Sequence, residues 1–388
     1  MDENELISLF TKADLTSVFH QYCLDGNYNE VQAMISKLTY EELNQIEPNG
    51  YTALHAAVLC NHLDIVKLLL NHGCSQTILN RYGRTAYQDA HTDEMRILFV
   101  RPRSQRFFDN NTTESFKLFI ANGNNIDMKK DIPDSWFKGY VRAEDTRESQ
   151  FILALGQAPF LIRKIYQNRI EFINMQSLYS LIIANVSRTH KEYVEVNNLY
   201  QTFAKKRNID HLLKLYTLET DIYSALQTQP DSFTILVYLY LTELKERAYR
   251  GHTYRGAKMN QPDIAAYRWA LSNQNYILET RSIQSMSKDE SVAQEFAELQ
   301  PGDKRYSVIF VYDFPERCKT AIDLTKISND LPLLSHYEKE QEVTLLPFTL
   351  FTVCNIETAS TTSQYRITLR NVPVPKQSAL MAFKNLRH

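Results

Sequence analysis

The sequence predicts a multidomain protein in which all-α repeats and a helical region are followed by an α/β domain built on a mixed sheet. Three observations in the 388-residue chain support this fold class. A repeat with a period of 33 residues occupies the first hundred residues, long amphipathic runs continue to about residue 248, and short β-branched and aromatic runs begin near residue 252. A chain of this length is sufficient for two or three domains with ordinary cores.

The N-terminal repeat is clearest in the segment NGYTALHAAVLCNHLDIVKLLLNHG at residues 49–73. Gly50 and Thr52 of this segment recur as Gly83 and Thr85, at a spacing of 33 residues. This period, with its turn, helix, loop and helix pattern, resembles the ankyrin repeat, whose units stack on a shared core.

These ankyrin-like repeats are predicted at residues 14–100. Two to three repeats form a short stack, so we expect the following domain to cover its last apolar face. Two roles remain open for the repeats on the sequence alone. They could support the following domain structurally, or they could offer a docking surface to a protein partner.

Between the repeats and the sheet domain, the sequence predicts a linker at residues 101–125 and a helical region at residues 126–204. The linker contains the polar stretches DNNTT and NGNN. The most apolar window of the chain, FTILVYLYLTEL at residues 233–244, has helical periodicity and is too short to cross a bilayer. We therefore expect a core helix there and no membrane partner.

The C-terminal domain is predicted at residues 205–388. From residue 252 the chain carries six or seven runs that are typical of strands. These runs are HTYRGA, YILETRSIQS, YSVIFVYDF, KTAIDL, EVTLLP, FTLFTVCNI and QYRITL. The segment VIFVY at residues 308–312 is apolar on both faces, which indicates a central strand.

The composition excludes several classes of function. The 43 basic and 45 acidic side chains nearly balance, so overall charge gives no reason to expect a nucleic-acid partner. The five cysteines lack CxxC spacing, which argues against a disulfide framework and a zinc site. The first residues, MDENELISLF, lack the basic and apolar parts of a secretory signal. We expect a cytoplasmic protein that uses no metal.

The first candidate site residue is Arg255, in the segment TYRGAK. An arginine inside an apolar strand is costly to bury alone and needs an anionic partner. That partner could be an acidic neighbour in a structural salt bridge or an anionic ligand. Gly256, which follows, would let another group approach the backbone closely.

The second candidate is Ser285, in the segment SIQSMSKDESVAQEF. Ser287 and Glu290 have the spacing of a capping box, so Ser287 is expected to cap the next helix. Ser285 lies two positions earlier on the same strand face and is free for another role. The helix is expected to bury one stripe, formed by Val292, Ala293, Phe296 and Ala297.

The third candidate is the glutamate run that opens EKEQEVTLLPFTLF. On an extended backbone, Glu338, Glu340 and Glu342 would all lie on one face. Carboxylates this close repel one another unless each has a partner, such as a cationic ligand or substrate. The alternative is a solvated acidic strand end.

Arg255, Ser285 and Glu342 occur in this order, with Glu340 two positions before the last. This arrangement resembles the R-S-E signature of the arginine-specific mono-ADP-ribosyltransferases. The resemblance covers residues 205–388 and differs from the family pattern where Met286 stands at the central threonine of the serine motif.

The resemblance implies roles for these residues. Glu342 would stabilise the positive charge on the ribose of NAD, Ser285 would hold that ribose, and Arg255 with Gly256 would bind the NAD phosphate region. Glu340 would orient and help deprotonate the guanidinium of an arginine-bearing acceptor protein, whereas Glu338 is expected to be solvated.

By this resemblance, the chain would transfer ADP-ribose from NAD, as a substrate, to arginine side chains and release nicotinamide, without a metal. Two alternatives remain open on the sequence. One is an NAD glycohydrolase, in which water replaces the acceptor arginine. The other is a non-catalytic ankyrin interaction protein with a degenerate transferase domain.

Overall fold

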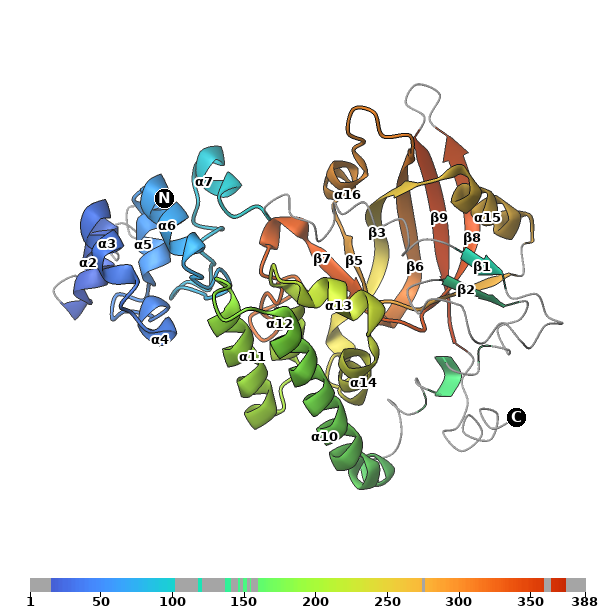
Figure 1. The fold of residues 1–388 in the computed structure, drawn as a ribbon, viewed down its shortest axis with the longest axis horizontal. Coiled ribbons are helices and arrows are strands. Elements are labelled where there is room, and N and C mark those ends of the chain that lie inside the picture. The colour runs from blue at the N-terminus through green and yellow to red at the C-terminus, as the bar shows by residue number, and fades with distance from the viewer. Residues whose placement is uncertain are drawn as a thin grey trace. The chain divides into compact units, whose positions relative to one another are not determined.

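The computed structural model describes residues 15–101, 118–120, 137–140, 146, 149–151, 154, 160–273, 276–358 and 364–374 (Figure 1). The chain forms two compact units and alternates between them. Unit 1 comprises Met1–Pro102, Val186–Glu219 and Lys326–Lys339. Unit 2 comprises Arg103–Asn185, Thr220–Thr325 and Glu340–His388.

Unit 1 begins with the repeats, whose described helices are short. They are α2 (Val18–Asp25), α3 (Tyr28–Ile35), α4 (Tyr40–Leu43), α5 (Ala53–Leu59), α6 (Leu63–Asn71) and α7 (Asp93–Ile97). Ser17, Thr52 and Thr92 each precede a helix and accept a hydrogen bond from the backbone N–H three residues later. Gly50 and Gly83 have positive φ angles of 87° and 70°, which glycine adopts without steric cost. The predicted repeat of a turn followed by helices is therefore confirmed.

Two further helices and one loop segment complete unit 1. The helices are α11 (Tyr193–Lys206) and α12 (Asp210–Thr217), and the segment is Lys326–Lys339. This division differs from the predicted boundaries at residues 126–204 and 205–388, because segments far apart in the chain pack on the repeats. The composition along the chain does not show that a distant segment folds back to pack on the repeats.

Glu195 on α11 is fully enclosed within unit 1. Its carboxylate accepts a hydrogen bond from the Ser75 hydroxyl at 3.2 Å. Burial, followed by repulsion from Glu192, raises the pKa of Glu195 to about 8. A carboxyl group in this position therefore keeps its proton when the unfolded chain has already lost it.

This raised pKa predicts that the stability of unit 1 falls as the pH rises. Below the ordinary pKa of a glutamate, both states are protonated and Glu195 costs nothing. Between that value and the folded pKa of about 8, only the unfolded state ionises, so the free energy of unfolding decreases. We expect Glu195→Gln to flatten this dependence in urea unfolding between about pH 5 and about pH 8. Equal slopes for this variant and a control, Glu30→Gln on the exposed side of α3, would contradict the assignment.

Unit 2 is organised around one mixed sheet, with strand order β1-β2-β4-β8-β9-β6-β3-β5-β7 among the described residues. Its strands are β1 (Leu118–Ile120), β2 (Phe137–Tyr140), β3 (Ala248–Met259), β4 (Ile277–Thr280), β5 (Gln284–Ser287), β6 (Tyr306–Asp323), β7 (Glu342–Leu345), β8 (Leu350–Thr358) and β9 (Tyr365–Val372). β6 pairs antiparallel with β3 and parallel with β9, which confirms a central position for residues 308–312. YSVIFVYDF and KTAIDL, expected as separate strands, both belong to β6.

The sheet also contains strands that the sequence did not predict. β1 lies in the predicted linker, and β2 lies in the segment predicted to be helical. β1 pairs parallel with β2, and β2 pairs antiparallel with β4. The prediction of linker and helix is therefore wrong for these residues, which join the sheet through backbone pairing with a distant strand.

Helices cover the two faces of this sheet. On one face α15 (Gln261–Ser272) packs Ile264 and Tyr267 into the main core with Phe310 and Tyr312. On the opposite face α16 (Glu290–Ala297) packs on β3 and β6. Because side chains alternate along a strand, β3 and β6 supply side chains to both cores.

The remaining described helices of unit 2 are α10 (Phe160–Asn185), α13 (Ile222–Thr228), α14 (Asp231–Leu239) and the 3₁₀ turn η5 (Lys245–Arg247). The core helix predicted within residues 233–244 is confirmed as α14, although the helix ends at Leu239. One helical stripe of this window is buried throughout and continues past the helix end; it consists of Phe233, Leu236, Val237, Tyr240, Leu241 and Leu244.

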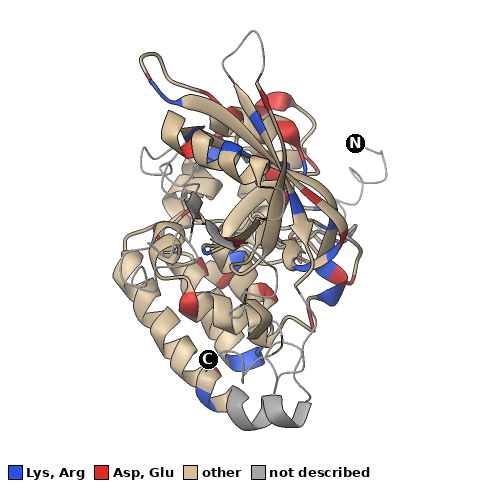
Figure 2. Ribbon diagram, turned by 90° about the vertical axis from the view of Figure 1, so that its right-hand side faces the viewer, with Lys and Arg blue, Asp and Glu red and all other residues tan. Residues whose placement is uncertain are grey.

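Basic and acidic residues are interspersed over the described elements (Figure 2). In the part of the chain that the structure describes, no helix combines the length and apolar character needed to span a bilayer.

Candidate active site

The site is built by three neighbouring strands of unit 2. β5 pairs with β7 so that Ser285 lies opposite Thr344 and Ser287 lies opposite Glu342. β3 pairs with the other side of β5. Arg255, Ser285 and Glu342 thereby line one cavity of about 600 Å³, a volume that includes space open to solvent.

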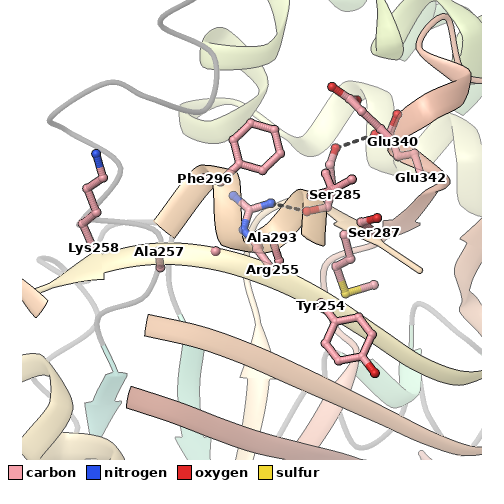
Figure 3. A pocket seen from close by; sticks show the side chains of 13 residues that line it. Tyr254, Arg255, Ala257, Lys258, Ser285, Ser287, Ala293, Phe296, Glu340 and Glu342 are labelled. Atoms are coloured by element: carbon pink, nitrogen blue, oxygen red, sulfur yellow. Dashed lines mark hydrogen bonds between the residues drawn. The ribbon is translucent and has the colours of Figure 1, made fainter. Parts of the chain in front are cut away.

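Ser285 and Glu342 form a direct pair in this cavity. The Ser285 hydroxyl donates to Oε1 of Glu342 at 2.6 Å, as Figure 3 shows. Glu342 is only 1% exposed and Ser285 only 7%. A distance this short is typical of a hydroxyl that donates to a charged carboxylate, so the strand pairing holds a buried negative group in a fixed orientation.

Arg255 donates hydrogen bonds to groups on two elements. Its Nη1 donates to the backbone carbonyl of Ser285 at 2.6 Å, and its Nη2 donates to the Tyr223 hydroxyl on α13 at 3.3 Å. Arginine keeps its charge in proteins, so these contacts fix a positive group in the cavity lining. The side chain is thus positioned from both the sheet and the helical layer.

The glutamate run does not form one strand face. Glu338–Glu340 forms the 3₁₀ turn η6, Gln341 has a φ of 42°, and β7 begins only at Glu342. The expected alternation of three carboxylates is therefore wrong, because the left-handed residue before β7 interrupts the extended backbone. Glu340 and Glu342 nevertheless both line the cavity (Figure 3).

The expectation of a solvated Glu338 is also wrong. Glu338 is half-buried in unit 1. Its carboxylate accepts hydrogen bonds from Thr85 Oγ1 at 2.6 Å and from the Gln88 side chain.

Gly256 has a clear packing role. A Cβ atom at this position would lie 2.1 Å from the Ala293 carbonyl oxygen and 2.7 Å from the Ala297 backbone nitrogen. The close approach predicted at Gly256 is thus made by the backbone of α16, and any larger residue would push this helix from β3. Because α16 supplies part of the cavity wall, Gly256 shapes the site through this contact.

The cap of α16 differs from the prediction. Asp289, not Ser287, is the N-cap, and its side chain accepts from the backbone N–H of Ser291. The Ser287 hydroxyl instead accepts from the backbone N–H of Asp289. Phe296, which helical periodicity assigned to the buried stripe, is half-buried and lines the cavity (Figure 3).

Met286 lies on the opposite face of β5 from its two serine neighbours. It is paired across the strands with Val343, and both side chains belong to the main core. The Thr253 hydroxyl donates to the Met286 sulfur at 3.3 Å. Met286 therefore fills space in the main core, on the face of β5 away from Ser285.

Two supports of the site could not be recognised from sequence spacing. Tyr223 reaches Arg255 from α13, and Lys288 joins the end of β5 to the end of β6. Lys288 Nζ lies 3.1 Å from Asp323 Oδ2 and 2.7 Å from Thr325 Oγ1. These partners are separated by more than thirty residues, and none stands in a motif of its own.

Comparison with known proteins identifies the N-terminal part. Residues 7–98 match the description of ankyrin repeats in three copies. Notch-regulated ankyrin repeat-containing protein B of Danio rerio is 32% identical over 104 residues, which cover 24% of this chain and 94% of the zebrafish protein. The chain belongs to the ankyrin-repeat family. This match concerns the repeats, so the ankyrin stack of unit 1 carries no information on the chemistry of unit 2.

Solved structures that are similar to a larger part of the chain include several ADP-ribosyltransferases. The Vis toxin, an ADP-ribosyltransferase from Vibrio splendidus, is 18% identical, with 56% of this chain and 87% of the toxin covered and a TM-score of 0.27. A variant of the eukaryotic mono-ADP-ribosyltransferase ART2.2 in complex with NADH is 13% identical, with 57% and 91% covered and a TM-score of 0.36. At this level of likeness, function has to be inferred from the residues of the site.

Proposed function

We propose that this chain is a mono-ADP-ribosyltransferase that transfers ADP-ribose from NAD to an arginine side chain of an acceptor protein. The observation that carries the proposal is the buried pair of Glu342 and Ser285, with Glu340 in the lining of the same cavity. The Glu342 carboxylate is buried and hydrogen-bonded, and Glu340 in the same lining is half-buried.

The side chains that line the cavity can bind the diphosphate, a ribose and the nicotinamide of NAD. Arg255 supplies a fixed positive charge for the diphosphate, and arginine is well suited to such oxygen acceptors. The Ser285 hydroxyl and the Glu342 carboxylate supply polar groups for a ribose. The half-buried ring of Phe296 offers an aromatic surface for the nicotinamide.

The proposed reaction breaks the bond between the ribose C1′ and the nicotinamide nitrogen. The bonding electron pair leaves with nicotinamide, and positive charge develops on the ribose. A carboxylate that is already oriented next to that carbon stabilises the developing charge without reorganisation. Glu342 is suited to this role because Ser285 and the strand pairing fix its position.

The second half of the reaction forms a bond between C1′ and a guanidinium nitrogen of the acceptor, which releases one proton. Glu340 would orient this guanidinium and accept the proton. In an NAD glycohydrolase, water would attack C1′ and would not need a carboxylate for a cationic acceptor. The position of Glu340 in the cavity lining therefore favours transfer.

The test uses full-length protein, labelled NAD and agmatine as a small guanidino acceptor. We expect nicotinamide release to rise with agmatine and label to appear on agmatine. Nicotinamide release with free ADP-ribose as the only labelled product would support the glycohydrolase. No NAD turnover and no NAD binding would support the non-catalytic alternative.

The contacts of Arg255 predict a double effect for Arg255→Ala. The variant loses the donors to the Ser285 carbonyl and the Tyr223 hydroxyl, so we expect the free energy of unfolding to fall by about 1–3 kcal/mol. NAD binding should weaken as well, because the cavity lining loses the positive charge of Arg255 while that of Lys258 remains. Urea unfolding and NAD titration measure the two effects, with Arg317→Ala, an exposed arginine of β6 outside the cavity lining, as the control. Normal NAD affinity in folded Arg255→Ala would mean that the arginine is structural only.

A further inference from the structure

Residues at equivalent positions of the second and third repeats form hydrogen bonds to different parts of unit 1. In the second repeat, the Gly50 carbonyl accepts from the backbone N–H of Arg81 at 2.9 Å. His55 Nε2 donates to the Arg84 carbonyl at 3.1 Å. Both partners belong to the start of the following repeat, so these two contacts join one repeat to the next.

Adding 33 residues gives the equivalent positions of the third repeat, which are Gly83, Thr85 and Gln88. The Gly83 carbonyl accepts from Lys326 Nζ at 2.5 Å. The side chains of Thr85 and Gln88 both donate to the carboxylate of Glu338. The contacts that would reach a fourth repeat are thus made to both ends of the segment Lys326–Lys339.

Other parts of unit 1 hold the same segment. The Arg101 guanidinium lies 3.9 Å from the ring centroid of Tyr337, and the backbone N–H of His336 donates to Thr217 Oγ1 at 2.9 Å. Leu334 and Tyr337 are buried. The segment is therefore packed along much of its length and is fixed most firmly just before Glu338.

The chain passes from this segment directly into the candidate active site. Glu338 and Glu340 belong to one 3₁₀ turn, and β7 starts two residues later with Glu342. Only one residue separates Glu338 from Glu340 in this turn, so a Glu338 side chain that is held in place limits the backbone conformations open to Glu340. The orientation of Glu340 is thus coupled through the backbone to the contacts of Glu338.

We propose that Lys326–Lys339 takes the place of a fourth repeat on the ankyrin stack, and that Thr85 and Gln88 position Glu340 for the acceptor by holding Glu338. Thr85 and Gln88 are positioning residues, since they act through Glu338. This inference rests on the proposed function. Its consequence is that the repeats contribute to transfer more than to the cleavage of NAD.

The experiment compares the same change in two repeats of the full-length chain. Thr85→Val removes the hydroxyl that binds Glu338 and keeps the side-chain shape. Thr52→Val is the matched control, because Thr52 occupies the equivalent position in the second repeat and bonds within its own repeat. Thr85→Ser restores the hydroxyl. For each variant, kcat and KM are measured for transfer to agmatine and for NAD hydrolysis, together with amide hydrogen exchange of residues 338–342.

We expect Thr85→Val to lower kcat/KM for agmatine by about 10- to 100-fold, the range that follows from a misplaced positioning group. NAD hydrolysis and the KM for NAD should stay near the wild-type values. Thr52→Val and Thr85→Ser should retain transfer. Amide exchange at residues 338–342 should be faster in Thr85→Val alone.

Three results would overturn the proposal. Equal losses in Thr85→Val and Thr52→Val would indicate general destabilisation of the repeats. Equal losses of transfer and hydrolysis in Thr85→Val would indicate damage to the NAD site. Unchanged exchange in Thr85→Val would show that the hydrogen bond does not hold the turn. If wild-type protein turns over no NAD, the proposed function fails, and the exchange data still decide whether the repeats hold residues 338–342.

Discussion

Glu342→Gln is expected to lower both transfer to arginine and hydrolysis of NAD by ~10²–10³-fold, the cost of losing one preorganised group that stabilises transition-state charge. The side chain keeps its shape and can still accept the Ser285 hydroxyl, but its negative charge is lost. Both reactions pass through the same positively charged ribose, so both should fall together. Initial rates of nicotinamide release, with and without agmatine, measure the effect.

Two controls make this prediction specific. Glu357→Gln, on an exposed part of β8, makes the same chemical change away from the cavity lining and should leave both rates unchanged. Urea unfolding of Glu342→Gln should stay near that of wild-type protein, since the buried side chain keeps its volume. Transfer at the wild-type rate in a folded Glu342→Gln variant would rule out the proposed role of this carboxylate.

Glu340→Gln is expected to separate the two reactions. The ribose pair of Ser285 and Glu342 remains, so slow hydrolysis of NAD should persist. Transfer should fall by ~10²–10⁴-fold, the usual contribution of a positioned acid or base, because the acceptor guanidinium loses the carboxylate that orients it and takes its proton. Label on agmatine and nicotinamide release are followed in the same samples.

The ratio of the two rates is the decisive quantity for Glu340→Gln. A ratio equal to that of wild-type protein, with both rates reduced, would mean that Glu340 serves the NAD site. An unchanged rate of transfer would mean that another group receives the proton. In combination with Thr85→Val, the loss should be no larger than that of Glu340→Gln alone, since both changes act on the same carboxylate.

The candidate site could be anticipated because its residues stand in short segments with a defined order. Arg255, Ser285 and Glu342 come from three strands that each carry a recognisable local pattern, and the structure brings all three to one cavity. Tyr223 has no such pattern, and its contact with Arg255 depends on where α13 packs. The supporting contacts of the site were therefore missed, and so was Lys258 in the lining, whereas the five predicted residues all lie in that lining.

The side-chain pattern typical of strands predicted most strands of the sheet from residue 252 onward. The same kind of pattern gave a wrong prediction at the glutamate run. Residues 338–342 read as an extended strand, since every second residue is a glutamate. The backbone forms a 3₁₀ turn there instead, with its first carboxylate bound by a threonine 253 positions earlier in the chain. A periodic pattern reports only local preference, and a buried hydrogen bond from a distant segment can outweigh it.

The sequence by itself determined the ankyrin repeats, the buried helix α14, the central strand at residues 308–312 and the order of the candidate site residues. These features follow from short-range periodicity and from side-chain chemistry at fixed spacing. Only the tertiary structure decided that β1 and β2 join the sheet, that Gly256 admits α16, and that Lys326–Lys339 binds the third repeat. The physical reason is that these contacts satisfy backbone groups, fill volume or pair charges between segments far apart in the chain, and such pairings leave no periodic trace in either segment alone.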